Sequence, residues 1–174
     1  MRPVWLLCLA FTSISCSPAT VVDQPAALVP ASPTISTVRQ ELEATFAARM
    51  RAYEMKDYAA LIDQVSPVYS AIRPNGARMT RDDLSGYIRL NLERWVRIIR
   101  QSNLIENVRL EGPNAVVDVR QDVARVQIVD GREAIVESSI VQTETWTPTS
   151  SGWKLLSVRD ERDGWIRIDG NPVR

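Results

Sequence analysis

Two kinds of hydrophobic periodicity occupy separate parts of this chain, and their separation most constrains its fold. Apolar residues recur at helical spacing in segments that end near Ile99, whereas from Leu104 to Val158 they alternate in runs separated by turns. Successive hairpins that follow a group of helices favour an α+β layer and argue against a parallel sheet with helical crossovers. The sequence therefore predicts one α+β domain.

The first two predicted helices precede residue 67. The first begins near Ser36 or Thr37, where Thr37 and Gln40 match a capping box. Its apolar stripe follows four-residue steps: Val38, Leu42, Phe46 and Met50. A break at Lys56-Asp57, with Asp57 as a cap, leads into a shorter helix that ends at Ser66-Pro67.

A third helix follows the turn signal Pro74-Asn75-Gly76. Thr80 is expected to cap it, with Asp83 in the reciprocal position of a capping box. Its apolar face comprises Leu84, Tyr87, Ile88, Leu92, Trp95, Val96 and Ile99. We expect the arginines on the same helix to form a solvated face.

The remaining chain is predicted to be strand and turn. The expected strands cover residues 104–110, 115–129, 135–147 and 153–158. Asp130-Gly131 is typical of a tight hairpin turn. The alternation slips between Arg120 and Val123, which predicts a bulge there. The tail, residues 160–174, is expected to add an edge segment or to cover one mouth of the fold.

Composition excludes several classes of function. The 174 residues include 21 basic and 21 acidic side chains, a balance without the basic face that nucleic-acid binding usually needs. Histidine is absent, and both cysteines, Cys8 and Cys16, lie near the N-terminus. The folded part therefore has no thiol, disulfide, or Cys or His metal site, and we expect neither a metal nor a cofactor.

The N-terminal residues indicate export. Residues 1–15 match a signal peptide, with Arg2 before an apolar run that is too short to span a membrane. Ser13-Ile14-Ser15-Cys16 resembles the lipobox of bacterial lipoproteins, although leucine is usual at position 13. The resemblance implies that Cys16 is lipidated. Because Ser17 is not aspartate, it also implies an outer membrane protein facing the periplasm. The alternative is ordinary cleavage nearby, with Cys16 left as a spare thiol.

Residues 16–36 form a predicted tether between the anchor and the fold. The segment contains four prolines, many small residues and a single charge at Asp23, so it cannot bury enough surface to fold. A lipid anchor needs such a spacer to lift a domain off the membrane. We therefore divide the chain into a signal peptide (1–15), a Pro-rich tether (16–36) and a folded domain (37–174).

The order of elements resembles the nuclear transport factor 2-like (NTF2-like) superfamily, including its SnoaL-like and ketosteroid-isomerase-like branches. The resemblance covers roughly residues 37–160. It is carried by Phe46-(x)6-Tyr53-(x)3-Asp57-(x)3-Leu61, by Gly76 followed by Thr80-Arg81-Asp82-Asp83-Leu84, by Ala115-Val116-Val117, by Glu144-Thr145-Trp146 and by Gly152-Trp153-Lys154-Leu155. It implies a cone-shaped fold in which three helices pack on a strongly curved antiparallel sheet and leave an apolar pocket. Enzymes, binding proteins and paired subunits share that fold, so it does not set the function.

Acid–base chemistry has few candidate residues here. The isomerase branch places an aspartate base after the second helix, but residues 66–72 contain no carboxylate, and the histidine of the dehydratase branch is absent. Glu144 occupies roughly the place of the isomerase branch's oxyanion-stabilising acid, where a buried, protonated carboxyl could donate a hydrogen bond. The alternative is a cross-strand pair with an arginine. Asp118 and Asp122 either face the pocket or line the solvated side of the sheet.

Aromatic residues are the candidate ligand contacts. Tyr53, Tyr69 and Tyr87 could supply hydroxyl donors, and Tyr53 is also a weak catalytic candidate beside Glu144 and Asp118. Trp95 and Trp146 could form an apolar wall. The simpler interpretation is that these aromatic residues belong to the core.

Three functions stay open from the sequence. The favoured one is an exported, lipid-anchored module that binds a small apolar ligand or a protein partner in the cell envelope without catalysis. The second is an acid–base enzyme of the isomerase, dehydratase or cyclase type acting on a small apolar substrate. The third is a structural envelope lipoprotein that forms a homodimer through an apolar patch on the outer sheet face.

Overall fold

The computed structural model describes residues 33–73 and 76–173. Over these residues three helices pack on a five-stranded antiparallel sheet, which confirms the predicted α+β class. The elements are α1 (Ile35–Glu54), α2 (Tyr58–Asp63), β1 (Ser70–Ile72), β2 (Arg78–Thr80), α3 (Arg81–Arg94), β3 (Trp95–Glu111), β4 (Asn114–Val129), β5 (Arg132–Thr149), β6 (Gly152–Ile168) and β7 (Asn171–Pro172). The predicted signal peptide, Cys16 and most of the predicted tether lie outside the described residues. Within the described ranges, no helix is both long enough and apolar enough to cross a membrane.

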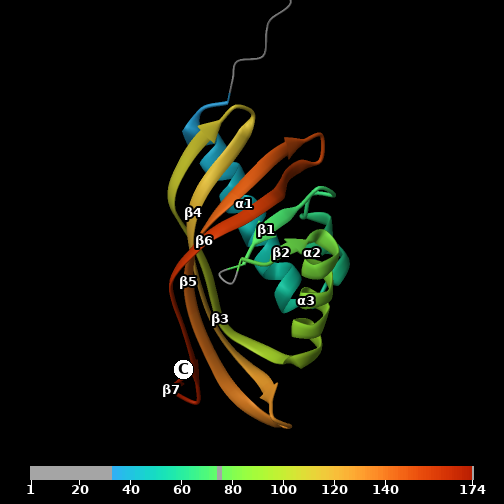
Figure 1. The fold of residues 1–174 in the computed structure, drawn as a ribbon, viewed down its shortest axis with the longest axis vertical. Helices are drawn as coiled ribbons and strands as arrows, with labels where there is room; N and C mark the ends of the chain where they lie inside the picture. The colour runs from blue at the N-terminus through green and yellow to red at the C-terminus, as the bar shows by residue number, and fades with distance from the viewer. Residues whose placement is uncertain (1–32, 74–75, 174) are drawn as a thin grey trace, which may run out of the picture. The chain divides into compact units, whose positions relative to one another are not determined.

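The large sheet has the strand order β3-β4-β5-β6-β7, while β1 and β2 form a separate hairpin. Figure 1 shows its long strands bending, with the helices on the inner side of the bend. Register shifts, which bend strands, occur in the β3–β4 and β5–β6 pairs. β4 and β5 pair without a break from Ala115↔Trp146 to Val129↔Arg132. The bulge predicted between Arg120 and Val123 is therefore wrong. The irregularities lie instead in the pairing of β3 with β4 and in that of β5 with β6.

The start of α1 is set by a residue that we expected to lie in the tether. Thr34 accepts a hydrogen bond from the backbone N–H of Thr37 at 3.2 Å. An N-cap side chain of this kind satisfies a backbone donor that the helix leaves unpaired. The helix therefore begins at Ile35, and Thr37 lies inside it, so the capping box predicted for Thr37 and Gln40 is wrong.

The other two helix starts are confirmed. Asp57 accepts from the backbone N–H of Ala60 at 3.0 Å and caps α2. Thr80 and Asp83 form the reciprocal capping box of α3, in which each side chain accepts from the backbone N–H of the other residue.

α3 ends earlier than its spacing predicted. The apolar positions continue at helical intervals to Ile99, but the helix stops at Arg94 and β3 begins at Trp95. The segment 96–99 is rich in β-branched residues, which lose rotamer freedom in a helix and suit a strand. Pairing with β4, which begins at Trp95↔Gln127, satisfies the backbone groups that the helix would have used.

The core has two parts that both depend on the helices. In the first, the α1 stripe packs against the inner face of the sheet, and Phe46 meets the fully buried Trp146 edge-on with ring centroids 5.5 Å apart. The second joins Ala52, Leu61, Ile88, Leu92 and Trp95, and so links α1, α2 and α3 to the start of β3. The inner face is therefore the side on which a site can form.

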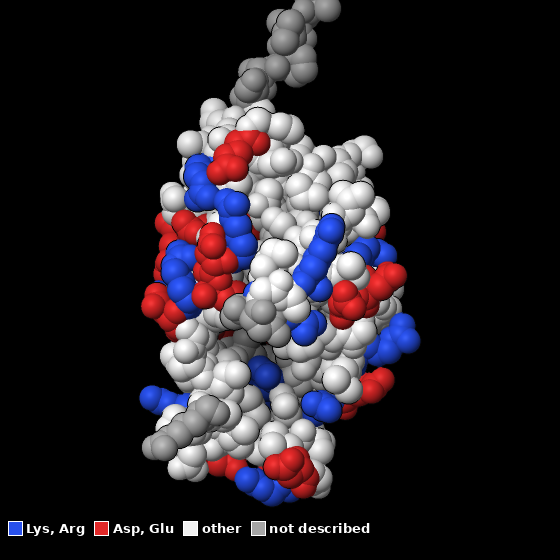
Figure 2. All heavy atoms as spheres, in the orientation of Figure 1, with Lys and Arg blue, Asp and Glu red and all other residues white. Residues whose placement is uncertain are grey.

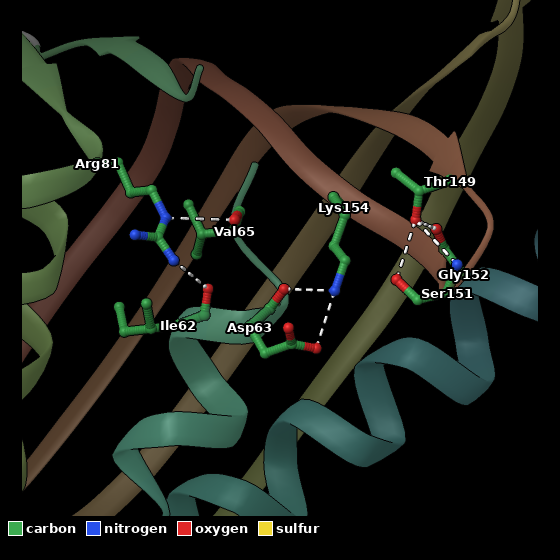
Figure 3. A network of polar contacts seen from close by, with 8 residues as sticks. All are labelled: Ile62, Asp63, Val65, Arg81, Thr149, Ser151, Gly152 and Lys154. Atoms are coloured by element: carbon green, nitrogen blue, oxygen red, sulfur yellow. Dashed lines mark hydrogen bonds and ion pairs between the residues drawn. The ribbon is translucent and has the colours of Figure 1, made fainter. Parts of the chain in front are cut away.

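Cationic side chains fix the segment that follows α2 (Figure 3). Arg81 donates to the carbonyls of Ile62 and Val65 at 3.2 and 3.4 Å, and Lys154 of β6 donates to the carbonyl and the carboxylate of Asp63 at 2.6 and 2.8 Å. These donors satisfy carbonyls that the C-terminus of a helix leaves unpaired. They hold residues 62–65 against α3 and β6, which positions the segment that leads to β1.

Candidate binding site on the inner face of the sheet

The inner face of the sheet carries polar as well as apolar side chains. Directly paired residues of adjacent strands point to the same face, and so do residues two apart in one strand. Glu144 pairs with Val117, and Asn103 pairs with Gln121, which places all four on the face that meets the helices. By the same register, the polar members of this face include Gln101, Asn103, Gln121, Arg125, Gln142 and Glu144.

The first group of polar residues, the Glu144 cluster, consists of Glu144, Arg49, Gln121, Gln142 and Trp146. Glu144 is fully buried. Arg49 of α1 donates to both carboxylate oxygens at 3.3 to 3.5 Å. Gln121 and Gln142 donate to Oε1 at 3.0 and 2.7 Å, and Trp146 Nε1 donates to Oε2 at 2.9 Å. The carboxylate therefore acts as an acceptor in each of these contacts.

This geometry supports the ion-pair interpretation of Glu144. A protonated carboxyl would need an acceptor for its O–H, and the neighbours of Glu144 are all donors. The arginine comes from α1 and not from an adjacent strand. Its guanidinium also lies 4.6 Å from the ring centroid of Phe46 and 5.6 Å from that of Trp146, which fixes its position. Trp146 is thus enclosed in the core.

The second group, the Trp95 cluster, consists of Trp95, Tyr53, Gln101, Asn103 and Arg125. Tyr53 of α1 packs on Trp95 with ring centroids 5.3 Å apart, and the Arg125 guanidinium lies 4.7 Å from the Trp95 ring centroid. Arg125 Nε donates to Gln127 Oε1 at 2.8 Å. Burial lowers the pKa of Arg125, because removal from water disfavours the charged form.

Polar atoms of the Trp95 cluster are shielded from solvent without a hydrogen-bond partner among the described residues. They are Trp95 Nε1, Gln101 Oε1 and Asn103 Nδ2, and a further such atom, Gln64 Oε1, lies elsewhere. Trp95 is only 8% exposed. Buried polar atoms are nearly always paired, and an unpaired one costs about 1–3 kcal/mol. Three such atoms within one stretch of β3 indicate a place where a bound molecule would complete the bonding.

Apolar side chains that remain partly or largely exposed surround this cluster on the same face. They come from four adjacent strands: Ile98, Val123, Ile140 and Ile166. Figure 2 shows a hollow near the middle of the face it views, with basic side chains in and beside it. An apolar surface with a few polar groups is typical of a small-molecule site.

The predicted tyrosines take three different positions. Tyr53 belongs to the Trp95 cluster, and burial raises the pKa of its hydroxyl, although the charge of Arg49 opposes the shift. Tyr69 lies in the core beside β1, where burial and the charge of Glu144 raise its pKa to about 12. Tyr87 lies on α3 and is 56% exposed. The structure therefore brings Tyr53, but not Tyr69 or Tyr87, into ring contact with Trp95.

Asp118 and Asp122 lie on the outer face, because each occupies the alternate position from the residues that face the helices. Asp118 pairs with Thr143, whose hydroxyl donates to Oδ1 at 2.7 Å, and Arg162 lies 3.4 Å from the same oxygen. The Thr143 hydrogen bond is the main reason that the pKa of Asp118 is lowered. Asp118 and Glu144 thus cannot act on one bound molecule. In the described ranges, no three carboxylates gather as metal ligands would.

Most polar members of both clusters were not predicted from the sequence: Arg49, Gln101, Asn103, Gln121, Arg125 and Gln142. A signal was nevertheless present for some. Arg49 stands between Phe46 and Tyr53 at the three- and four-residue steps of the buried face of α1. In β4, Gln121 and Arg125 continue the alternate positions held by Val117, Val119 and Val123. A polar residue at a position that the pattern assigns to the core can therefore mark a site.

Solved structures share this arrangement of elements. A candidate dehydratase of the NTF2-like family from Streptomyces avermitilis matches over 72% of this chain and 95% of its own, with a TM-score of 0.59 and 20% identity. An NTF2-like superfamily protein from Salmonella enterica matches over 74% and 92%, with a TM-score of 0.56 and 17% identity. The fold is NTF2-like. A candidate aromatic ring hydroxylase from Novosphingobium aromaticivorans shares it over 75% and 95%, with a TM-score of 0.55 and 15% identity.

The NTF2-like fold confirms the three helices and the curved antiparallel sheet that the resemblance implied. At these identities the likeness concerns the fold alone, and the names of the similar proteins differ in activity, so the fold does not decide between binding and catalysis. No protein-family model matches the sequence, and no curated protein matches it.

Proposed function

We propose that the NTF2-like domain is a non-catalytic module that binds a small, largely apolar ligand on the inner face of its sheet. The observation that carries the proposal is the Trp95 cluster. Trp95 Nε1, Gln101 Oε1 and Asn103 Nδ2 are shielded yet unpaired within the described ranges. A ligand placed here would supply a partner to those of the three atoms that it reaches, while its apolar part would lie against the partly exposed apolar residues of the same face.

The Glu144 cluster supports binding over catalysis. General acid–base catalysis requires a group that exchanges a proton with the substrate within hydrogen-bond reach. Arg49, Gln121, Gln142 and Trp146 occupy both oxygens of Glu144. We assign this cluster the role of fixing α1 to the sheet, which holds Tyr53 against Trp95.

We further propose that the protein is exported and held at a membrane by a lipid anchor. The signal-peptide pattern of residues 1–15 and the lipobox-like Ser13-Ile14-Ser15-Cys16 support export and a lipid anchor at Cys16. The domain would then act in the periplasm, tethered to the outer membrane. Mass spectrometry of the mature protein extracted from membranes tests this: we expect a lipid-modified Cys16 as the first residue, and an unmodified N-terminus at any other residue would exclude the anchor.

Native mass spectrometry of the purified protein tests the binding function. We expect a fraction of the protein to carry an additional small-molecule mass. Trp95→Phe removes the unpaired Nε1–H and replaces the indole with a smaller aromatic ring, so it should lower the occupied fraction. Trp165→Phe is the matched control, because Trp165 lies on the outer face and is 42% exposed. Equal occupancy in the two variants would place the ligand away from the Trp95 cluster.

A further inference from the structure

The contacts of Arg125 differ from those of Arg49, which also faces the interior. Arg49 is paired with the buried Glu144. Arg125 is half-buried, yet it forms an ion pair with none of the carboxylates in residues 33–73 and 76–173. A cation withdrawn from water without a counter-charge is unfavourable, and the lowered pKa of Arg125 has the same cause.

The geometry of Arg125 leaves one edge of its guanidinium for a ligand. Nε donates to Gln127, and the plane of the group lies near the Trp95 ring. Among the described residues, neither terminal nitrogen of Arg125, Nη1 or Nη2, has a hydrogen-bond acceptor. Two parallel N–H groups at the end of an arginine match the two oxygens of a carboxylate.

Two of the unpaired atoms follow Arg125 along the sheet, that of Gln101 one step away and that of Asn103 two steps away. Gln101 pairs with Val123, which is two residues from Arg125 along β4, and Asn103 is two residues further along β3. Each such step spans about 7 Å. An unpaired acceptor on Gln101 requires a hydroxyl or N–H on the ligand, while the partly exposed Ile98, Val123 and Ile140 suit an apolar body.

We infer that the ligand of this site is a small organic acid, with a carboxylate bound by Arg125, a hydroxyl or N–H group bound by Gln101, and an apolar or aromatic body. The inference rests on the proposed binding function and adds the chemical class of the ligand. A single carboxylate matches the single charge of Arg125 better than a phosphate, which carries up to two charges. Glu144, an acidic residue of this face, does not oppose such a ligand directly because Arg49 pairs with it.

Isothermal titration calorimetry with matched acids and amides tests the inference. The probes are phenylacetate, mandelate and hexanoate, each compared at pH 7 with its own amide. We expect the wild-type protein to bind at least one acid about tenfold or more tightly than the amide, since charge-assisted bonds are roughly twice as strong as neutral ones. Mandelate, which adds a hydroxyl, should bind more tightly than phenylacetate.

Variants of Arg125 test whether its guanidinium causes the preference for the acid over the amide. Arg125→Gln should abolish the preference for acid over amide, and Arg125→Lys, which keeps the charge but loses the two-pronged geometry, should retain part of it. Arg120→Gln on the outer face is the control and should keep the full preference. Thermal unfolding of each variant establishes that it is folded before titration.

The outcomes separate this inference from the proposed function. Acids and amides that bind equally, with affinities that fall in Trp95→Phe, would overturn the organic-acid inference and keep the binding site. An acid preference that survives Arg125→Gln would also overturn it. If no probe binds and native mass spectrometry finds no co-purified molecule, both the inference and the proposed function fail.

Discussion

The two polar clusters of the inner face differ in how completely their shielded polar atoms are hydrogen-bonded. Both contain polar side-chain atoms that are shielded from solvent. In the Glu144 cluster, Arg49, Gln121, Gln142 and Trp146 complete the bonding of the carboxylate. In the Trp95 cluster, donors and an acceptor remain unpaired, and Arg125 has no carboxylate partner among the described residues. A saturated network holds a fold together, whereas an unsaturated one is available to a ligand.

The largest expected effect is loss of stability when the Glu144 cluster is broken. Glu144→Gln keeps the size of the side chain but turns an amide N–H₂ toward donors and leaves Arg49 without its counter-charge. We expect a loss of about 3 kcal/mol or more in the free energy of unfolding, as for other buried pairs deprived of one partner. Urea unfolding followed by tryptophan fluorescence measures it.

The double variant Arg49→Met with Glu144→Met supplies the control for that loss. It removes both charges together but leaves the donors of Gln121, Gln142 and Trp146 without their acceptor, so its stability separates the cost of an unpaired Arg49 from the cost of these donors. A Glu144→Gln protein as stable as the wild type would show that the cluster does not hold the fold, and the contrast with the Trp95 cluster would disappear.

Substitutions in the Trp95 cluster should raise the free energy of unfolding, not lower it. Gln101→Met and Asn103→Leu replace side chains that bear unpaired atoms with apolar ones of similar shape, so each should raise the free energy of unfolding by about 1 kcal/mol. The same changes should weaken ligand binding, a common exchange between stability and function. Ser102→Ala, whose side chain points to the other face, is the control and should change neither quantity appreciably.

Sequence patterns predicted the architecture better than the site, and the two clusters explain why. Alternation and capping residues such as Thr80 and Asp83 encode local structure, so the order of helices and strands could be found. The slip in alternation near Gln121 suggested a bulge because the pattern assigns polar residues to solvent. Gln121 instead faces inward, where it donates to Glu144. That partner is 23 positions away in the chain, and no local pattern contains it.

The end of α3 likewise could not be predicted from local sequence spacing. Trp95 and Ile99 satisfy helical spacing, but the residues between them also suit a strand. The choice depends on β4, which pairs with this segment from a distance along the chain. Since the Trp95 cluster begins at that junction, the error in the helix end also concealed Gln101 and Asn103 as members of the inner face.

Tyr69 offers a smaller effect that depends on pH. Burial and the charge of Glu144 raise its pKa from 10.0 to about 12, so the folded state keeps the proton more strongly than the unfolded chain does. The contribution of the neutral hydroxyl is present in full below pH 10 and is lost as the pH rises through about 12.

Alkaline unfolding checks this assignment. In Tyr69→Phe, the free energy of unfolding should decline less steeply between pH 10 and pH 12 than in the wild type. Tyr87→Phe, which changes a tyrosine that is 56% exposed, is the matched control and should follow the wild-type curve. Identical slopes in Tyr69→Phe and the wild type would place the alkaline sensitivity in another group.

The smallest effect is expected on the outer face, at Asp118. Asp118 and its ion-pair partner Arg162 are partly exposed, so Asp118→Asn should lower stability by less than about 1 kcal/mol near pH 7, although the other partner, Thr143, is buried. Because the folded-state pKa of Asp118 is lowered, its contribution is present above the ordinary value and is lost as the pH falls, so the two proteins should converge in acid. Ligand binding should not change, because Asp118 faces away from the Trp95 cluster. A large loss of binding in Asp118→Asn would mean that the two faces of the sheet are coupled, and the inner face could then no longer be treated as a separate site.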